Sequence, residues 1–190
     1  MADEKTQTGA SFTVTINDGA KADKPADTMP EPASRDYTWK GKGKQTIKYT
    51  ATAEYLPIHE DDGTLIGNMF ALSYVSDAQD KTDRPITFCW NGGPGGSSAM
   101  VNVGGLGPRH VPISNNEQLP CPTQPEDNPY SILPDTDLIY LDAMGTGYSQ
   151  VAKGYDAKKV WGVDGDADAF MRGIAQWLTT HERWNSPLYI

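Results

Sequence analysis

The sequence PITFCW at residues 85–90, followed by NGGPGGSS at residues 91–98, is the most informative stretch for the fold class. A short, continuous apolar run that enters a cluster of glycines is typical of a strand buried on both faces in the middle of a sheet. Residues 137–143 (DLIYLDA) have the same pattern and also end at glycines. A further apolar run begins at Pro187 and continues to Ile190. These runs predict the strands of a parallel core.

One long helix is predicted before the last of these runs, over residues 164–181. Asp164 is placed to cap it, and Asp166 and Asp168 follow where the helix dipole favours negative charge. We therefore interpret the acidic cluster as a helix start and not as a metal site. Three- and four-residue spacing predicts one apolar face made of Ala167, Phe170, Met171, Ile174, Trp177 and Leu178. The order strand, helix, strand predicts an α/β fold.

Two longer strands are predicted upstream of the glycines. Apolar and polar residues alternate over residues 47–58, and residues 65–75 (LIGNMFALSYV) form a more apolar run. The sequence Asp61-Asp62-Gly63 between them is typical of a turn. The pair is therefore predicted to form an antiparallel hairpin that leads into the parallel core.

Two other regions are predicted to be irregular. Residues 1–36 are rich in acidic residues and prolines and poor in large apolar ones, so we expect a disordered acidic tail before a folded portion at residues 37–190. Within this tail only residues 11–16 alternate weakly, as an edge strand would. Residues 115–134 contain five prolines and are predicted to form an irregular surface loop.

The composition argues against several classes of protein. The chain has 190 residues, with 16 Lys and Arg against 25 Asp and Glu, and a formal net charge of -9. We expect no nucleic-acid partner, because phosphate binding requires clustered basic side chains. No stretch approaches the ~20 apolar residues of a membrane span. Cys89 and Cys121 lack metal-ligand spacing, so neither a metal nor another cofactor is expected.

The glycine-rich stretch allows three roles: binding phosphate, stabilising an oxyanion or turning sharply. A P-loop requires GxxxxGK[ST], and no lysine lies between Arg84 and Arg109. The dinucleotide-binding pattern GxGxxG fails from both Gly93 and Gly105. In α/β-hydrolases the loop after the third strand supplies one backbone N–H to the oxyanion hole. The spacing favours this role, while a purely structural turn and a backbone phosphate site stay open as alternatives.

The sequence offers no convincing catalytic triad. Gly147-Tyr148-Ser149-Gln150-Val151 begins like the GxSxG nucleophile motif but ends in valine, so we predict that Ser149 is not the nucleophile. Ser97 and Ser98 are expected to form local hydrogen bonds within the glycine-rich loop. The histidines are each more typical of surface or packing positions than of a catalytic base: His59, His110 and His181.

Three motifs in order carry a family resemblance: FCWNGGPGGSS at residues 88–98, LGP at residues 106–108 and DLIYLDAMGTGYS at residues 137–149. Together they resemble the serine carboxypeptidase family, the cathepsin A-like carboxypeptidases, in a bacterial form. HERWNSPLYI at residues 181–190 is similar to the family's approach to its nucleophile, which a GESYG motif normally follows. The resemblance implies an N-terminal fragment whose nucleophilic Ser, Asp and His lie beyond Ile190.

The resemblance also implies an α/β-hydrolase fold and the release of C-terminal residues from peptides through an acyl-enzyme. By position, Gly93 would supply an oxyanion N–H, and Asn91 and Gly92 would help to hold the substrate's terminal carboxylate. The implied partner is a peptide with a free C-terminus, and the 190-residue chain alone is expected to be inactive. Members of the family are often secreted, periplasmic or vacuolar. Residues 1–20 contain no signal peptide, which predicts a cytoplasmic protein if Met1 is the true start.

Some positions depart from the family pattern. Gly105 stands where eukaryotic members carry a Glu that binds the substrate carboxylate, and Gly96 stands where a disulfide-forming Cys is common. Ala143 and Met144 replace an expected Pro. The first departure keeps open a hydrolase of the same fold that acts on esters or acyl groups. A non-catalytic binding module, in which the glycines only turn the chain, is the other alternative.

Overall fold

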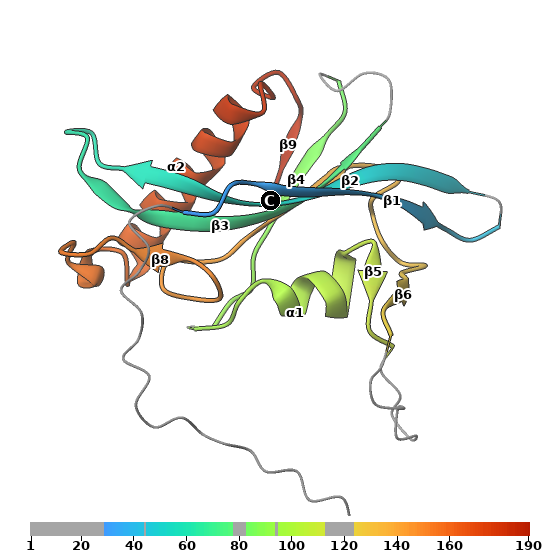
Figure 1. The fold of residues 1–190 in the computed structure, drawn as a ribbon, viewed down its shortest axis with the longest axis horizontal. Helices are drawn as coiled ribbons and strands as arrows, with labels where there is room; N and C mark the ends of the chain where they lie inside the picture. Colours follow the sequence, from blue (N-terminus) through green and yellow to red (C-terminus); the bar gives the residue numbers. More distant parts are fainter. Residues whose placement is uncertain (1–28, 44, 78–82, 94, 113–123) are drawn as a thin grey trace, which may run out of the picture.

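The computed structural model describes residues 29–43, 45–77, 83–93, 95–112 and 124–190 (Figure 1). Its strands are β1 Ala33–Lys40, β2 Thr46–His59, β3 Leu65–Ser76, β4 Ile86–Cys89, β5 Arg109–His110, β6 Glu126–Asp127, β7 Asp137–Leu141, β8 Gln150–Val151 and β9 Leu188–Tyr189. Its helices are α1 Ala99–Val101, the π-helix η1 Asn102–Leu106, the 3-10 helix η2 Ala157–Lys159 and α2 Val163–Thr180. One mixed sheet has the order β1-β2-β3-β7-β4-β9, with β8 paired to β3, and β5 and β6 form a separate pair.

The predicted hairpin is confirmed. β2 and β3 pair antiparallel over almost their whole length, with Tyr55 opposite Phe70 and a register shift at Ile58 and His59. The turn lies where the sequence places it, and Gly63 has a φ of 86°, which favours glycine. The hairpin therefore gives the sheet its long antiparallel half.

The predicted parallel core is also present. β4 lies between β7 and β9 and is parallel to both, with Phe88 opposite Ile139 and Thr87 opposite Tyr189. β7 pairs antiparallel with β3 and so joins the core to the hairpin. A mixed sheet with parallel strands and a crossover helix is an α/β arrangement.

Apolar side chains cover both faces of the sheet. On one face, α2 packs Trp177 edge-on against Phe88, with ring centroids 5.8 Å apart. Gly173 lets α2 approach β3 closely, because a Cβ at this position would lie 2.4 Å from the Met69 sulfur. On the other face, Trp39 and Tyr140 belong to a second cluster beside the segment that contains α1. Figure 1 shows α1 on the side of the sheet opposite α2.

The helix differs from its prediction in two details. α2 begins at Val163 with Gly162 as its N-cap, so Asp164 lies within the first turn and does not cap the helix. Met171 is 58% exposed, and Ala167 is exposed as well, so neither belongs to the buried face. The backbone at Gly162 has a φ of 138°, and this residue caps the helix two positions before the predicted Asp164 cap.

The predicted tail and proline-rich loop need corrections where the structure describes them. Ala33–Lys40 forms β1, so the predicted boundary after residue 36 falls inside a strand. Pairing with β2 and stacking of Tyr37 on Tyr49, at 5.7 Å, order this segment despite its polar sequence. Residues 1–28, including residues 11–16, lie outside the described residues. In the proline-rich loop, Asn128 and Leu133 are buried, so the second half of that loop packs against the core.

Candidate functional site

The glycine-rich loop and the loop after β7 lie at the same edge of the sheet. β4 and β7 are parallel neighbours, so their carboxyl ends point the same way. The buried Asp142 carboxylate joins the two loops, because it accepts hydrogen bonds from the backbone N–H groups of Ser98 (2.7 Å) and Tyr148 (3.1 Å). A hydrogen bond from the Ser98 hydroxyl to the Leu141 carbonyl oxygen adds a second link. These hydrogen bonds fix the loop after β4 relative to the loop after β7.

Ser149 has a structural position in this arrangement. Its side chain is buried, and its hydroxyl donates to the Asp142 carbonyl oxygen at 2.7 Å. The same Oγ accepts a hydrogen bond from the Phe70 N–H at 2.8 Å. Ser149 therefore links β3 to the loop after β7, which fits the prediction that it is not the nucleophile.

Short backbone contacts explain why the loop after β4 contains so many glycines. Gly95 has a φ of 94°, which disfavours residues with a Cβ. A Cβ on Gly96 would lie 2.2 Å from Nδ2 of Asn91, and a Cβ on Gly93 would lie 2.8 Å from the Gly95 nitrogen. Asn91 is fixed by a hydrogen bond from its side-chain amide to the Gly92 carbonyl oxygen at 2.9 Å. Both Gly92 and Gly93 are exposed, and neither donates a hydrogen bond from its N–H to a described residue.

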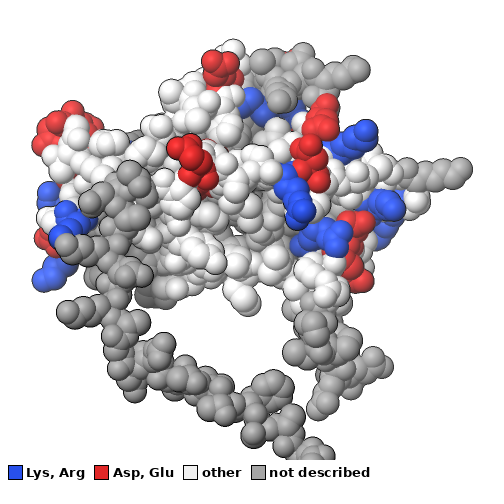
Figure 2. Space-filling view, in the orientation of Figure 1, with Lys and Arg blue, Asp and Glu red and all other residues white. Residues whose placement is uncertain are grey.

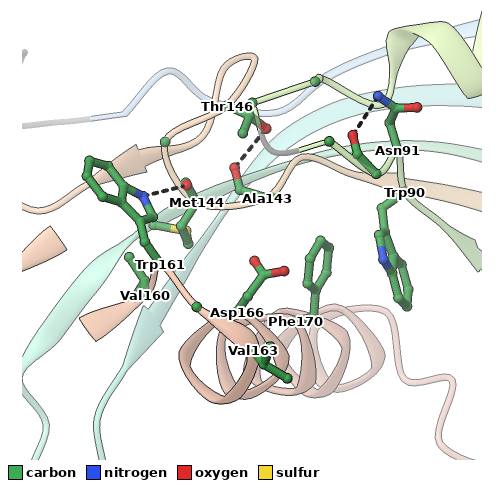
Figure 3. A pocket seen from close by; sticks show the side chains of 16 residues that line it. Trp90, Asn91, Ala143, Met144, Thr146, Val160, Trp161, Val163, Asp166 and Phe170 are labelled. Atoms are coloured by element: carbon green, nitrogen blue, oxygen red, sulfur yellow. Dashed lines mark hydrogen bonds between the residues drawn. The ribbon is translucent and has the colours of Figure 1, made fainter. Parts of the chain in front are cut away.

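A cavity of about 580 Å³ opens next to these glycines (Figure 3). Its wall combines the loop after β4, the loop after β7 and the start of α2: Trp90, Asn91, Gly92, Gly93, Gly95, Gly96, Ala143, Met144, Gly145, Thr146, Val160, Trp161, Gly162, Val163, Asp166 and Phe170. Trp90 stacks on Phe170 with centroids 4.5 Å apart, and the Trp161 indole N–H donates to the Met144 carbonyl oxygen at 3.3 Å. The structure therefore brings Asn91, Gly92 and Gly93 together on one wall of an aromatic cavity.

None of the three histidines lines this cavity. His59 ends β2 and is exposed, and Nε2 of His110 lies 3.2 Å from a carboxylate oxygen of Glu126. Nε2 of His181 lies 2.7 Å from the buried Glu54, and its ring stacks on Trp177. Among the described residues, no group of His, Cys, Asp or Glu forms a candidate metal site.

The ionisable groups near the site differ in their surroundings. Asp166 is the one ionisable side chain among the described residues that line the cavity, and partial burial raises its pKa. Burial also raises the pKa of the Cys89 thiol to about 11, so at neutral pH it is not a thiolate nucleophile. Gly105 lies outside the cavity wall, and its carbonyl oxygen accepts a hydrogen bond from Asn128 at 2.7 Å.

Sequence reasoning missed Trp161, Asp166 and Phe170 as part of this cavity. It assigned Phe170 to the core face of the helix and Asp166 to the helix start. A tryptophan directly before an amphipathic helix was the available signal for Trp161, and the structure shows this side chain 61% exposed. No helix of the described residues is long and apolar enough to cross a membrane. On the face shown in Figure 2, basic and acidic side chains are interspersed around a broad uncharged area.

A family model described as serine carboxypeptidase matches residues 42–190, which is most of the chain. No curated protein matches the chain. The chain therefore belongs to the serine carboxypeptidase family.

Proposed function

We propose that this member of the serine carboxypeptidase family has an α/β-hydrolase fold and releases C-terminal residues from peptides through an acyl-enzyme. In this proposal Gly93 supplies one oxyanion N–H, and Asn91 and Gly92 hold the terminal carboxylate of the peptide. The observation that carries the proposal is the cavity wall itself. It presents the exposed amides of Gly92 and Gly93, which donate to no described residue, at the carboxyl end of a parallel strand.

These amides can act on the reaction in a defined way. When a serine hydroxyl attacks the peptide carbonyl, its proton passes to a histidine and negative charge develops on the carbonyl oxygen. N–H groups already directed at that oxygen stabilise the charge without reorganising. No side chain occupies the space beside Gly92, since a Cβ there would meet no atom within 4 Å. A substrate carbonyl can therefore approach the backbone closely.

The triad is proposed to lie outside residues 1–190. Among the described residues no histidine lines the cavity, and Ser149 is used in the link to β3. β9 runs parallel to β4, so its carboxyl end lies at the edge that carries the glycine-rich loop. A nucleophile that follows β9 would therefore lie beside the proposed oxyanion amides. The chain alone is accordingly expected to turn over neither blocked dipeptides nor activated esters.

The decisive test is Gly93→Ala in a protein that includes the proposed triad. The new Cβ would lie 2.8 Å from the Gly95 nitrogen and would displace the amide from its position. We expect kcat to fall by about 10²–10³-fold, as for loss of one oxyanion donor, with a smaller change in KM. Gly104→Ala is the matched control, because a Cβ there meets nothing within 4 Å and Gly104 does not line the cavity. Equal kcat values for the two variants would contradict the oxyanion role.

Gly105 supports a second candidate, a hydrolase of esters or acyl groups. This position carries no side chain, its carbonyl oxygen is bound by Asn128, and it lies away from the cavity wall. It therefore offers no carboxylic acid to pair with a substrate carboxylate. Comparing peptides that have free and amidated C-termini separates the two candidates. A strong preference for the free carboxylate supports the carboxypeptidase, and equal rates support the alternative.

A further inference from the structure

The proposed oxyanion amides lie in a loop that makes few hydrogen bonds to described residues. Gly92 and Gly93 are exposed, and neither N–H donates to a described residue. Glycine has more backbone freedom than any other residue, so a glycine-rich loop alone does not hold its amides in one direction. Amides are effective in an oxyanion hole because they are directed at the oxygen before the charge develops. A group outside the loop must therefore fix the backbone at these two glycines.

Ser98 ties the two ends of the loop together and to the end of β7. Its Oγ accepts the Asn91 N–H at 3.2 Å and donates to the Leu141 carbonyl oxygen. Its own N–H donates to Oδ1 of Asp142 at 2.7 Å. Asn91 directly precedes Gly92, so the first and the last residue of the loop are both held from the end of β7.

The Asp142 carboxylate anchors this connection. Asp142 is only 5% exposed, and its second oxygen, Oδ2, accepts the Tyr148 N–H at 3.1 Å. No lysine, arginine or histidine of the described residues pairs with it. Each carboxylate oxygen therefore binds a backbone donor, and such charge-assisted hydrogen bonds are roughly twice as strong as neutral ones. An asparagine here could accept only one of the two N–H groups in this geometry, because its amide nitrogen is a donor.

The surroundings of this carboxylate fix its position. The Asp142 N–H donates to the Phe70 carbonyl oxygen at 3.0 Å, and the Asp142 carbonyl oxygen accepts the Ser149 hydroxyl at 2.7 Å. A Cβ on Gly147 would lie 1.9 Å from Oδ2 and 2.8 Å from the Ser97 Cβ, so the turn packs tightly around the carboxylate. Asp142 does not line the cavity, so it acts on the site only through its neighbours.

We propose that Asp142 is a positioning residue for the proposed reaction. Acting through Ser98 and Asn91, its carboxylate directs the two glycine amides into the cavity. The inference rests on the proposed function, because it takes these amides as donors to the substrate. It adds that catalysis depends on a buried charge outside the cavity wall. This carboxylate accepts no proton and forms no bond in the reaction.

Binding of a peptide aldehyde and of the matching alcohol tests this in a protein that includes the proposed triad. The probes are benzyloxycarbonyl-phenylalaninal and benzyloxycarbonyl-phenylalaninol. When the serine Oγ bonds to the aldehyde carbon, the carbonyl electron pair moves to the oxygen and the serine proton passes to the histidine. The aldehyde adduct therefore uses the oxyanion amides, whereas the alcohol forms no such bond.

Asp142→Asn should weaken aldehyde binding and lower kcat by about 10–100-fold, because a misplacement of about 1 Å can cost 10²-fold in rate. The affinity for the alcohol should change little, since it does not depend on the oxyanion amides. A merely structural role of Asp142 would lower the folded fraction and leave the ratio of the two affinities unchanged. Ser98→Ala is the second variant in case Asp142→Asn does not fold. It removes the acceptor of the Asn91 N–H and should weaken aldehyde binding selectively as well.

Asp62→Asn is the matched control. It removes the same charge and the same kind of bond, because Oδ1 of Asp62 accepts the Thr64 N–H at 2.8 Å in the hairpin turn, outside the cavity. This variant should keep both affinities. An unchanged ratio of aldehyde to alcohol affinity in folded Asp142→Asn, or in Ser98→Ala, overturns the inference and leaves the proposed function intact. If the unsubstituted protein binds both probes equally, the proposed function is contradicted and the inference with it.

Discussion

Two carboxylates at opposite ends of the parallel strands β4 and β7 differ in their surroundings: Asp137 at the amino end and Asp166 at the carboxyl end. At the amino end, Asp137 is fully buried and binds Nε of Arg84 at 2.7 Å and the guanidinium of Arg183 at 2.8 Å. It also accepts the Ser76 N–H at 2.9 Å. At the carboxyl end, Asp166 faces a cavity without a described partner.

The two ends therefore have different roles in the molecule. The amino end connects β3, β4, β7 and the segment before β9 through one carboxylate, so its charges act on stability. The carboxyl end leaves amides and a carboxylate available to a ligand, so its unsatisfied groups act on binding. Substitutions at the first end should therefore change unfolding, and those at the second end should change binding or catalysis.

The largest effect is expected at Asp137. Asp137→Ala would leave Arg84 and Arg183 without their shared counter-ion, and Arg183 is only 3% exposed. Breaking a buried ion pair from one side costs about 3–5 kcal/mol. The free energy of unfolding measured in urea should fall by that amount, or the variant should fail to fold. Asp135→Ala changes an exposed carboxylate in the adjacent turn and should leave unfolding nearly unchanged. Similar losses in both variants would contradict the structural role of the Asp137 ion pairs.

Ser149→Ala should give the next largest effect, although Ser149 lies close to the functional end. Removing its hydroxyl leaves the Phe70 N–H and the Asp142 carbonyl oxygen without this partner. A buried group left unpaired costs about 1–3 kcal/mol, which urea unfolding can measure. Ser97→Ala in the same region, where the hydroxyl has no described hydrogen bond, should cost much less. Loss of any ester turnover in Ser149→Ala would instead identify a nucleophile.

The smallest effect concerns the pH dependence of stability at Asp166. Burial raises the pKa of this carboxyl in the folded protein, so its charged form is the less stable one. The contribution of Asp166 to the free energy of unfolding is present at low pH, where the carboxyl is neutral. It is lost as the pH rises through the pKa of the folded state. The stability of Asp166→Asn relative to the wild type should therefore increase as the pH rises above about 4, the ordinary pKa of an aspartate. Asp164→Asn controls for the helix dipole, and a decrease in the same range would contradict the burial effect.

Much of the fold could be predicted from local pattern. Continuous apolar runs identify β4, β7 and β9, because a strand that is buried on both faces is apolar at successive positions. Three- to four-residue spacing identifies α2, because a helix that is buried on one face is apolar at that interval. β1 could not be found in this way. Its residues are almost all exposed, and its order comes from pairing with β2 and from the burial of Trp39.

The candidate site could be predicted only in part. Asn91, Gly92 and Gly93 stand in one uninterrupted motif, so their shared wall follows from the sequence. Asp166 and Phe170 join that wall because α2 begins at the carboxyl edge of the sheet, and this depends on strand order. The same is true of Asp137 and Arg183, which are 46 positions apart in the sequence.

β9 has a practical consequence for work with this chain in solution. It lies at the end of the strand order, and Leu188, Tyr189 and Ile190 are 45%, 57% and 85% exposed. An apolar edge strand offers its free backbone groups as a template to a second molecule. Light scattering at increasing protein concentration should therefore detect self-association, and ligand titrations need dilute samples or a lysine placed on this edge to keep the molecules apart.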